Sequence, residues 1–123
     1  MAGNHGHQLL DNGNLLFFSA NSSGSHGLPS PVYEYAFSDE DGVLTATLEW
    51  TYEEELGSDQ LGDVQRLPNG HTLVTYSIYY TADSNLAQGT IREVSPLGTV
   101  VRSVSGNAFG YASFRETLYG PPQ

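Results

Sequence analysis

The residues best suited to chemistry lie near the start of the chain, where Asn4-His5-Gly6-His7-Gln8 is the densest polar cluster. One residue separates His5 from His7, so both side chains would lie on the same face of a β-strand. Three interpretations stay open. The two histidines are exposed polar residues at a strand start, or two ligands for Zn or Cu whose third ligand the spacing does not identify. Under the third interpretation they are catalytic, because imidazole titrates near neutrality and can act as a nucleophile.

Three other groups of residues have weaker claims to a function. Asp39-Glu40-Asp41-Gly42 offers oxygen ligands for calcium, but it lacks the alternate spacing of a calcium loop and is more typical of a solvated turn. Glu53-Glu54-Glu55 indicates a solvated loop or the start of a short helix. Five aromatic residues are suited to stacking on a sugar or to filling the space between packed sheets: Trp50, Tyr52, Tyr79, Tyr80 and Tyr111.

The charge of the chain excludes several classes of partner. The 123 residues include no cysteine and no lysine, and the four arginines face fourteen carboxylates, for a formal charge of −10. Binding to nucleic acid or to an anionic membrane requires clustered cations, so neither is expected. A disulfide framework and a thiolate metal site are excluded by composition. The sequence contains no glycine-rich phosphate loop, and we expect no cofactor.

An internal repeat organises the chain. The segment His7-Gln8-Leu9-Leu10-Asp11-Asn12-Gly13 aligns with Val64-Gln65-Arg66-Leu67-Pro68-Asn69-Gly70, at an offset of 57 residues. Further along, Val32-Tyr33-Glu34-Tyr35 aligns with Ile91-Arg92-Glu93-Val94. A fixed period of this size is typical of repeat architectures. The two units therefore predict two copies of one structural element.

Each unit is expected to form four β-strands. The Asn12-Gly13 and Asn69-Gly70 pairs are typical of two-residue hairpin turns, in which both positions accept a positive φ. The runs around them are rich in Val, Thr, Tyr, Phe and Leu, which favour strands. We expect strands near residues 5–10, 14–19, 31–37, 43–51, 62–67, 71–80, 88–95 and 98–105, and a last strand near 110–119. Helix is expected at most over a single turn at residues 53–57.

Repeated four-stranded units favour an all-β partial propeller of antiparallel blades. The predicted domain covers residues 1–123, with one blade at about 5–52, a second at about 62–105 and a closing strand at about 110–119. Two blades leave two faces open, and blades are stable only against neighbours. The missing blades are expected from a longer chain or from other copies. A homotrimer is favoured because three copies can close a ring.

At these motifs the chain resembles the arylsulfotransferase family of β-propellers. The resemblance rests on His5-Gly6-His7-Gln8-Leu9-Leu10-Asp11-Asn12-Gly13-Asn14, on Pro31-Val32-Tyr33-Glu34-Tyr35 and on Glu49-Trp50-Thr51-Tyr52. The segment from Gly62 to Leu73 is similar to the following blade, and Tyr111 and Arg115 match the closing strand. The resemblance covers almost the whole chain but only about the C-terminal third of a family member.

The resemblance implies transfer of a sulfuryl group between phenols through a sulfohistidine, with His5 as the nucleophile and an aryl sulfate or phenol as the ligand. It also implies a periplasmic or secreted location. The chain departs from the family at Phe18-Ser19-Ala20-Asn21, where the family has Phe-Asp-Asn-Gly, and it lacks the blades that supply the cations around the sulfate. The alternative function is a non-catalytic propeller scaffold or ligand-binding module that assembles into a ring or stack.

Overall fold

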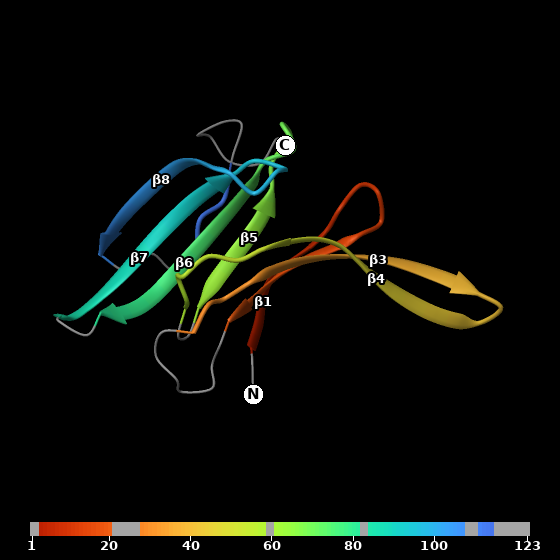
Figure 1. Ribbon diagram of the computed structural model, residues 1–123, viewed down its shortest axis with the longest axis horizontal. Coiled ribbons are helices and arrows are strands. Elements are labelled where there is room, and N and C mark those ends of the chain that lie inside the picture. The colour runs from red at the N-terminus through yellow and green to blue at the C-terminus, as the bar shows by residue number, and fades with distance from the viewer. Residues whose placement is uncertain (1–2, 21–27, 59–60, 82–83, 108–110, 115–123) are drawn as a thin grey trace, which may run out of the picture.

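The structure, a computed structural model, describes residues 3–20, 28–58, 61–81, 84–107 and 111–114. For residues 78–81 and 84–87 it describes the backbone alone. The described residues form two antiparallel sheets of four strands each (Figure 1) and contain no helix. The all-β prediction is therefore confirmed, and no helix suited to crossing a membrane occurs in this part of the chain. The strands are β1 Gly3–Leu9, β2 Leu15–Ala20, β3 Val32–Glu40, β4 Val43–Tyr52, β5 Gly62–Arg66, β6 Thr72–Thr81, β7 Ser84–Val94 and β8 Val100–Asn107.

Both sheets are simple meanders, because each strand pairs with the next one along the chain. The first sheet has the order β1-β2-β3-β4 and the second the order β5-β6-β7-β8. Each of the two repeated sequence units thus corresponds to one sheet. Residues 53–57, where a helical turn was considered, form an irregular connection instead.

The tight turns differ in detail from the sequence prediction. At the first turn, Gly13 N donates to Leu10 O and Leu10 N donates to Asn14 O, which closes a loop of three residues rather than two. Gly13 and Gly70 have φ values of 86° and 83°, whereas neither preceding asparagine is left-handed. This is a type I turn followed by a left-handed glycine. The asparagine side chains instead accept hydrogen bonds from the backbone two residues later, as Asn12 Oδ1 does from Asn14 N at 3.0 Å.

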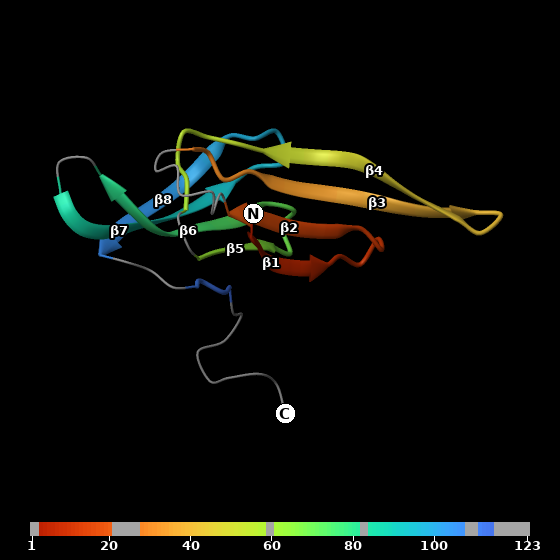
Figure 2. The ribbon, with the colours of Figure 1, turned by 90° about the horizontal axis from the view of Figure 1, so that it is seen from below.

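The two-residue turn with two positive φ values lies between β3 and β4. Glu40 pairs with Val43, and Asp41 and Gly42 between them have φ values of 55° and 80°. Strand β3 therefore continues through residues that were expected to form a loop. Because β2 pairs with β3 only from Val32 to Tyr35, the rest of this hairpin projects from the sheet as a two-stranded arm (Figures 1 and 2).

The core lies between the two sheets, which pack face to face and approach each other most closely where β5 lies beside β1 and β2. We call the packed surfaces the inner faces. The first sheet contributes Leu16, Phe18, Ala20, Val32 and Tyr52, and the second contributes Val64, Val74, Tyr76 and Val94. The Phe18 ring meets Tyr76 edge to face, at a centroid distance of 5.7 Å.

One glycine permits the close approach of the two sheets. A Cβ atom on Gly62 would lie 2.1 Å from Cε1 of Phe18, far inside van der Waals contact. The absence of a side chain at this position therefore lets the Phe18 ring lie directly against the β5 backbone. This contact contributes to the complete burial of Phe18.

The outer faces carry the residues that alternate with the core positions. On the first sheet the outer face presents His7, Phe17, Tyr33 and Tyr35, whose rings form a chain of contacts with centroid distances of 5.7–6.2 Å. On the second sheet it presents Leu73, Ile91 and Glu93, beside which residues 111–114 lie. These four residues are in no strand, and the rest of the expected closing strand, Arg115 included, lies outside the described residues.

Candidate functional site

The two predicted catalytic histidines lie on β1 but do not share a face. His5 pairs with Phe18 and Gln8 pairs with Leu16, so β1 has one extra residue opposite Phe17. Gly6, in this bulge, has a φ of 59°. Opposite residues of an antiparallel pair project to the same side, which directs His5 toward the inner face with Phe18. His7 stacks on Phe17 at 6.0 Å on the outer face. The expectation of a common face is therefore wrong, because the bulge reverses the alternation.

The strand segment that carries His5 is bordered by a carboxylate. The side chain is half-buried at the start of β1. Next to it, a Cβ atom on Gly6 would lie 2.3 Å from Oδ1 of Asp63, so this carboxylate closely borders β1. Burial raises the pKa of Asp63 above its usual value, and the hydrogen bond from Val64 N offsets only part of this rise. A sulfate ester requires converging cations or N–H donors, and a carboxylate at this position opposes its binding.

The three arginines within the described ranges are engaged elsewhere. Arg66 is bound to Glu34, Arg92 donates to Glu54 at 3.2 Å, and Arg102 lies 3.5 Å from Glu93. Arg66 lies at the opposite end of β5 from Gly62, four residues and therefore about 13 Å along the strand. Within this part of the chain, no group of three or more His, Cys, Asp or Glu residues is arranged to hold a metal ion.

A buried polar cluster instead joins the two sheets. Glu34 is 6% exposed and accepts hydrogen bonds from Asn14 Nδ2 at 2.7 Å and from Arg66 Nη2 at 2.8 Å. The Arg66 guanidinium also donates to Thr72 Oγ1 at 3.0 Å and lies 5.2 Å from the Trp50 ring centroid. Burial by itself raises the pKa of Glu34, but the hydrogen bonds from Asn14 and Arg66 outweigh it and leave this pKa below its usual value. Glu34 is therefore held as a carboxylate that joins the two sheets through Arg66.

The equivalent cluster on the second sheet is built without a neighbouring sheet. His71 and Glu93 occupy the repeat positions of Asn14 and Glu34, and His71 Nδ1 lies 2.7 Å from Glu93 Oε1. The cation beside Glu93 is Arg102, from β8 of the same sheet. The hydrogen bond with His71, followed by smaller effects that include the charge of Arg102, lowers the pKa of Glu93. The His71 side chain is thus engaged with Glu93.

Two tyrosines lie with an ion pair at the far end of the interface. Tyr52 and Tyr76 are buried near Glu54, which accepts from Arg92. Burial, followed by the charge of Glu54, raises the pKa of Tyr52 to about 12 and raises that of Tyr76 further. Both phenols therefore stay protonated at neutral pH. Among the glutamates of residues 53–55, Glu54 has this structural role, which the sequence did not indicate.

Of the five aromatic residues considered for sugar stacking or for filling the space between packed sheets, Trp50 and Tyr52 have the second role. Trp50 and Tyr52 stack on each other at 6.3 Å between the sheets, and the Trp50 indole donates to Pro96 O at 3.0 Å. Tyr111 is exposed on the C-terminal segment, and the side chains of Tyr79 and Tyr80 lie outside the described set. The continuous aromatic surface lies instead on the outer face of the first sheet. The alternation of Tyr33 and Tyr35 along β3 was the signal for it, and Phe17 lies directly opposite Tyr33.

The acidic turn is a hairpin tip. Asp39 Oδ1 accepts a hydrogen bond from Gly42 N at 3.0 Å, and both residues are exposed at the end of the arm. This geometry satisfies the turn itself, and it matches the interpretation of a solvated turn rather than a calcium site.

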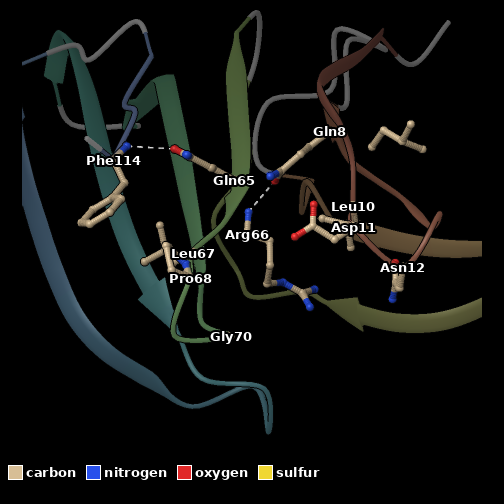
Figure 3. A pocket seen from close by; sticks show the side chains of 11 residues that line it. Gln8, Leu10, Asp11, Asn12, Gln65, Arg66, Leu67, Pro68, Gly70 and Phe114 are labelled. Carbon is tan, nitrogen blue, oxygen red and sulfur yellow. Dashed lines mark hydrogen bonds between the residues drawn. The ribbon is translucent and has the colours of Figure 1, made fainter. Parts of the chain in front are cut away.

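A groove of about 520 Å³ runs between the first turns of the two sheets (Figure 3). Two glutamines from equivalent repeat positions line it. Gln8 Oε1 accepts from Arg66 N at 2.6 Å, which fastens β5 to the first sheet. Gln65 Oε1 accepts from Phe114 N at 2.8 Å, which fastens the C-terminal segment to the second sheet in the same manner. The groove is therefore lined by groups that hold successive strands together.

Comparison with known proteins gave no match: no protein-family description, curated protein or solved structure is significantly similar to this chain.

Proposed function

We propose that this chain is a propeller-type scaffold module, a pair of blade-like sheets that is completed by further sheets of the same kind. The observation that carries the proposal is that the two outer faces match, by the repeat, the two faces that pack on each other. The inner face of the first sheet packs on the inner face of the second. By the repeat, the outer face of the second sheet corresponds to the inner face of the first, and the outer face of the first sheet corresponds to the inner face of the second. The aromatic outer face of the first sheet thus corresponds to a surface that the second sheet buries.

The polar contacts also support a structural role. Glu34, Arg66, Arg92 and Glu54 join the two sheets rather than converge on an open cavity. These pairs favour one arrangement of the elements and engage two of the three arginines in the described part of the chain. The groove between the sheets is likewise lined by hydrogen bonds between side chain and backbone that hold successive segments together.

The mass of the chain in solution tests the proposal. Two open faces should drive self-association, with a trimer as the favoured closed state and an open stack as its alternative. Light scattering across a concentration series should give a mass above that of the 13.3 kDa chain. A compact monomer that binds no hydrophobic dye would contradict the scaffold proposal.

Sulfuryl transfer is the second candidate, and the position of His5 favours it. This histidine is half-buried on the first strand and directed toward the inner face, where an imidazole nitrogen can be shielded from water. In the reaction, that nitrogen attacks the sulfur of an aryl sulfate, the bond from sulfur to the phenolic oxygen breaks, and the phenolate leaves. A second phenol then attacks the sulfohistidine, loses its proton and releases the imidazole.

An assay with an aryl sulfate separates the two functions. Wild type, His5→Ala and the matched variant His71→Ala are incubated with the sulfate and a phenol, and phenol release and a labile sulfo adduct are measured. The enzymatic candidate requires turnover that His5→Ala alone abolishes. Identical behaviour of all three proteins refutes it and leaves the scaffold function.

A further inference from the structure

Residues 111–114 lie on the second sheet at the position where β5 lies on the first. Figure 3 shows two hydrogen bonds that are accepted by glutamines 57 residues apart. The side-chain oxygen of each glutamine accepts from a backbone N–H of the next segment along the chain. The segment around Phe114 therefore fills the place of an innermost strand. Beside it a groove of about 540 Å³ remains, with Leu73, Ile91, Glu93 and Arg102 among its lining residues.

From this arrangement we infer that the groove on the outer face of the second sheet is the docking site for a second copy of the chain, which inserts β1 and the aromatic outer face of its first sheet. The inference rests on the proposed scaffold function. The docked β1 displaces residues 111–114 and takes over the hydrogen bond to Gln65. The contact is head to tail, because it joins two different surfaces.

The apolar residues of the two surfaces correspond to those of the packed interface. Leu73 and Ile91 in the groove are the repeat equivalents of Leu16 and Val32, which are fully buried between the sheets. Phe17 and Tyr35 of the incoming copy are the equivalents of Val74 and Val94, which cover Leu16 and Val32. The larger rings carry more apolar area into the groove than the two valines do.

The two interfaces differ in which sheet supplies the cation beside the shared repeat position of the glutamate, Glu34 or Glu93. In the packed interface, the cation beside Glu34 is Arg66, which belongs to the second sheet. The Arg66 guanidinium lies over the ring of Trp50, which belongs to the first sheet and pairs with Glu34. On the second sheet Arg102 takes the position of Trp50, directly opposite Glu93, and supplies the cation locally. The repeat equivalent of Arg66 in an incoming copy is Leu9, which needs no partner charge.

This difference explains an exposed apolar residue. Leu9 is 74% exposed at the end of β1, although its repeat equivalent is engaged in the interface. In the docked complex Leu9 lies over Arg102 and the already neutralised Glu93, so no carboxylate is buried without a cation. The net charge of −10 on each copy opposes association, so added salt should strengthen it.

Single-cysteine variants test the docking geometry on the full chain, which has no cysteine of its own. Leu9→Cys is mixed with Pro68→Cys, an exposed position on the rim of the groove, and treated with a short bismaleimide. In the control, Leu9→Cys is mixed with Thr45→Cys, an exposed position on the projecting arm. We expect the first mixture to give cross-linked heterodimer at several times the yield of the second. Equal yields would overturn the docking geometry.

A second variant tests displacement of the C-terminal segment. Phe114→Pro removes the N–H that donates to Gln65, so the incoming strand no longer has to break that bond. The association constant from light scattering should rise about fivefold, the factor that one typical hydrogen bond provides. Tyr111→Pro is the control, since Tyr111 is exposed in the same segment. An unchanged or reduced constant in Phe114→Pro would overturn the displacement.

The two proposals fail in different ways. If the wild-type chain is a compact monomer, both the scaffold function and the docking site are wrong. If the chain associates but the Leu9 and Pro68 positions do not cross-link above the control, the docking site alone is wrong and the scaffold function stands.

Discussion

Replacing Arg66 by methionine should reverse the effect of acid on the Glu34 contribution to stability. Methionine keeps most of the apolar stem against Trp50 but removes the guanidinium that donates to Glu34 at 2.8 Å. The side chains of Glu34 and Arg66 are 8% and 25% exposed, so breaking this pair should lower the free energy of unfolding by less than breaking a fully buried pair would. We expect the free energy of unfolding at pH 7 to fall by about 2–3 kcal/mol.

The sign of the pH effect follows from the contributions to the Glu34 pKa. In the wild type this pKa is lowered, so the stabilisation by Glu34 is complete above the ordinary glutamate pKa of about 4.3 and is lost as the pH falls through the lower, folded value. In Arg66→Met we expect the burial of Glu34, the largest contribution, to outweigh the hydrogen bonds that remain from Asn14 and Asn12 and so to raise the pKa. The penalty is then complete at neutral pH and is relieved as the pH falls.

Urea denaturation at several pH values between 7 and 4 measures this reversal. The difference in stability between wild type and Arg66→Met should shrink toward pH 4, and adding Glu34→Gln to the variant should restore about 1–2 kcal/mol at pH 7. Arg102→Met is the matched control, because Arg102 is 84% exposed in its ion pair and its loss should change stability little. An equal loss at pH 4 and pH 7, without rescue by Glu34→Gln, would refute the assignment of a buried, charged Glu34.

Two further predictions concern glycines and are checked by the same urea denaturation. Gly62→Val should cost about 2–3 kcal/mol because its Cβ would overlap the Phe18 ring, and Phe18→Leu should recover part of that loss; additive losses would contradict the steric cause. Gly13→Ala should cost about 1–2 kcal/mol, since its φ is positive but the space around it is empty. Gly6→Ala should cost more than Gly13→Ala, because its Cβ would also meet Asp63, and equal costs would show that only the backbone conformation matters.

Much of the strand arrangement could be predicted from the sequence because its signals are local. The two Asn-Gly pairs mark hairpins at equivalent places, although a third residue joins each loop and only glycine is left-handed. The bulge at Gly6 also had a signal, because an isolated glycine within a strand pattern often marks one. Taking β1 as a regular strand instead gave the wrong relation between His5 and His7.

The contacts of the candidate site could not be predicted in the same way. Arg66 and Glu34 are 32 residues apart, and nothing in their own segments indicates that they meet. Their pairing depends on how closely two sheets pack, and that distance depends on the contact between Gly62 and Phe18. The aromatic surface of Phe17, Tyr33 and Tyr35 depended on register, which the alternating pattern of each strand indicates but does not fix across strands.

The projecting β3–β4 arm divides one hairpin into two regions of different local stability. Beyond Tyr35 this ladder has no third strand beside it, and every residue from Phe37 to Glu49 is exposed. A two-stranded ribbon without a packed face is marginal in water, so amide hydrogens in the arm should exchange with solvent through fraying of its tip. Those near Val32 and Tyr52, at the buried base, should exchange only when the whole chain unfolds. Proteases should accordingly cut the arm while the two sheets remain intact.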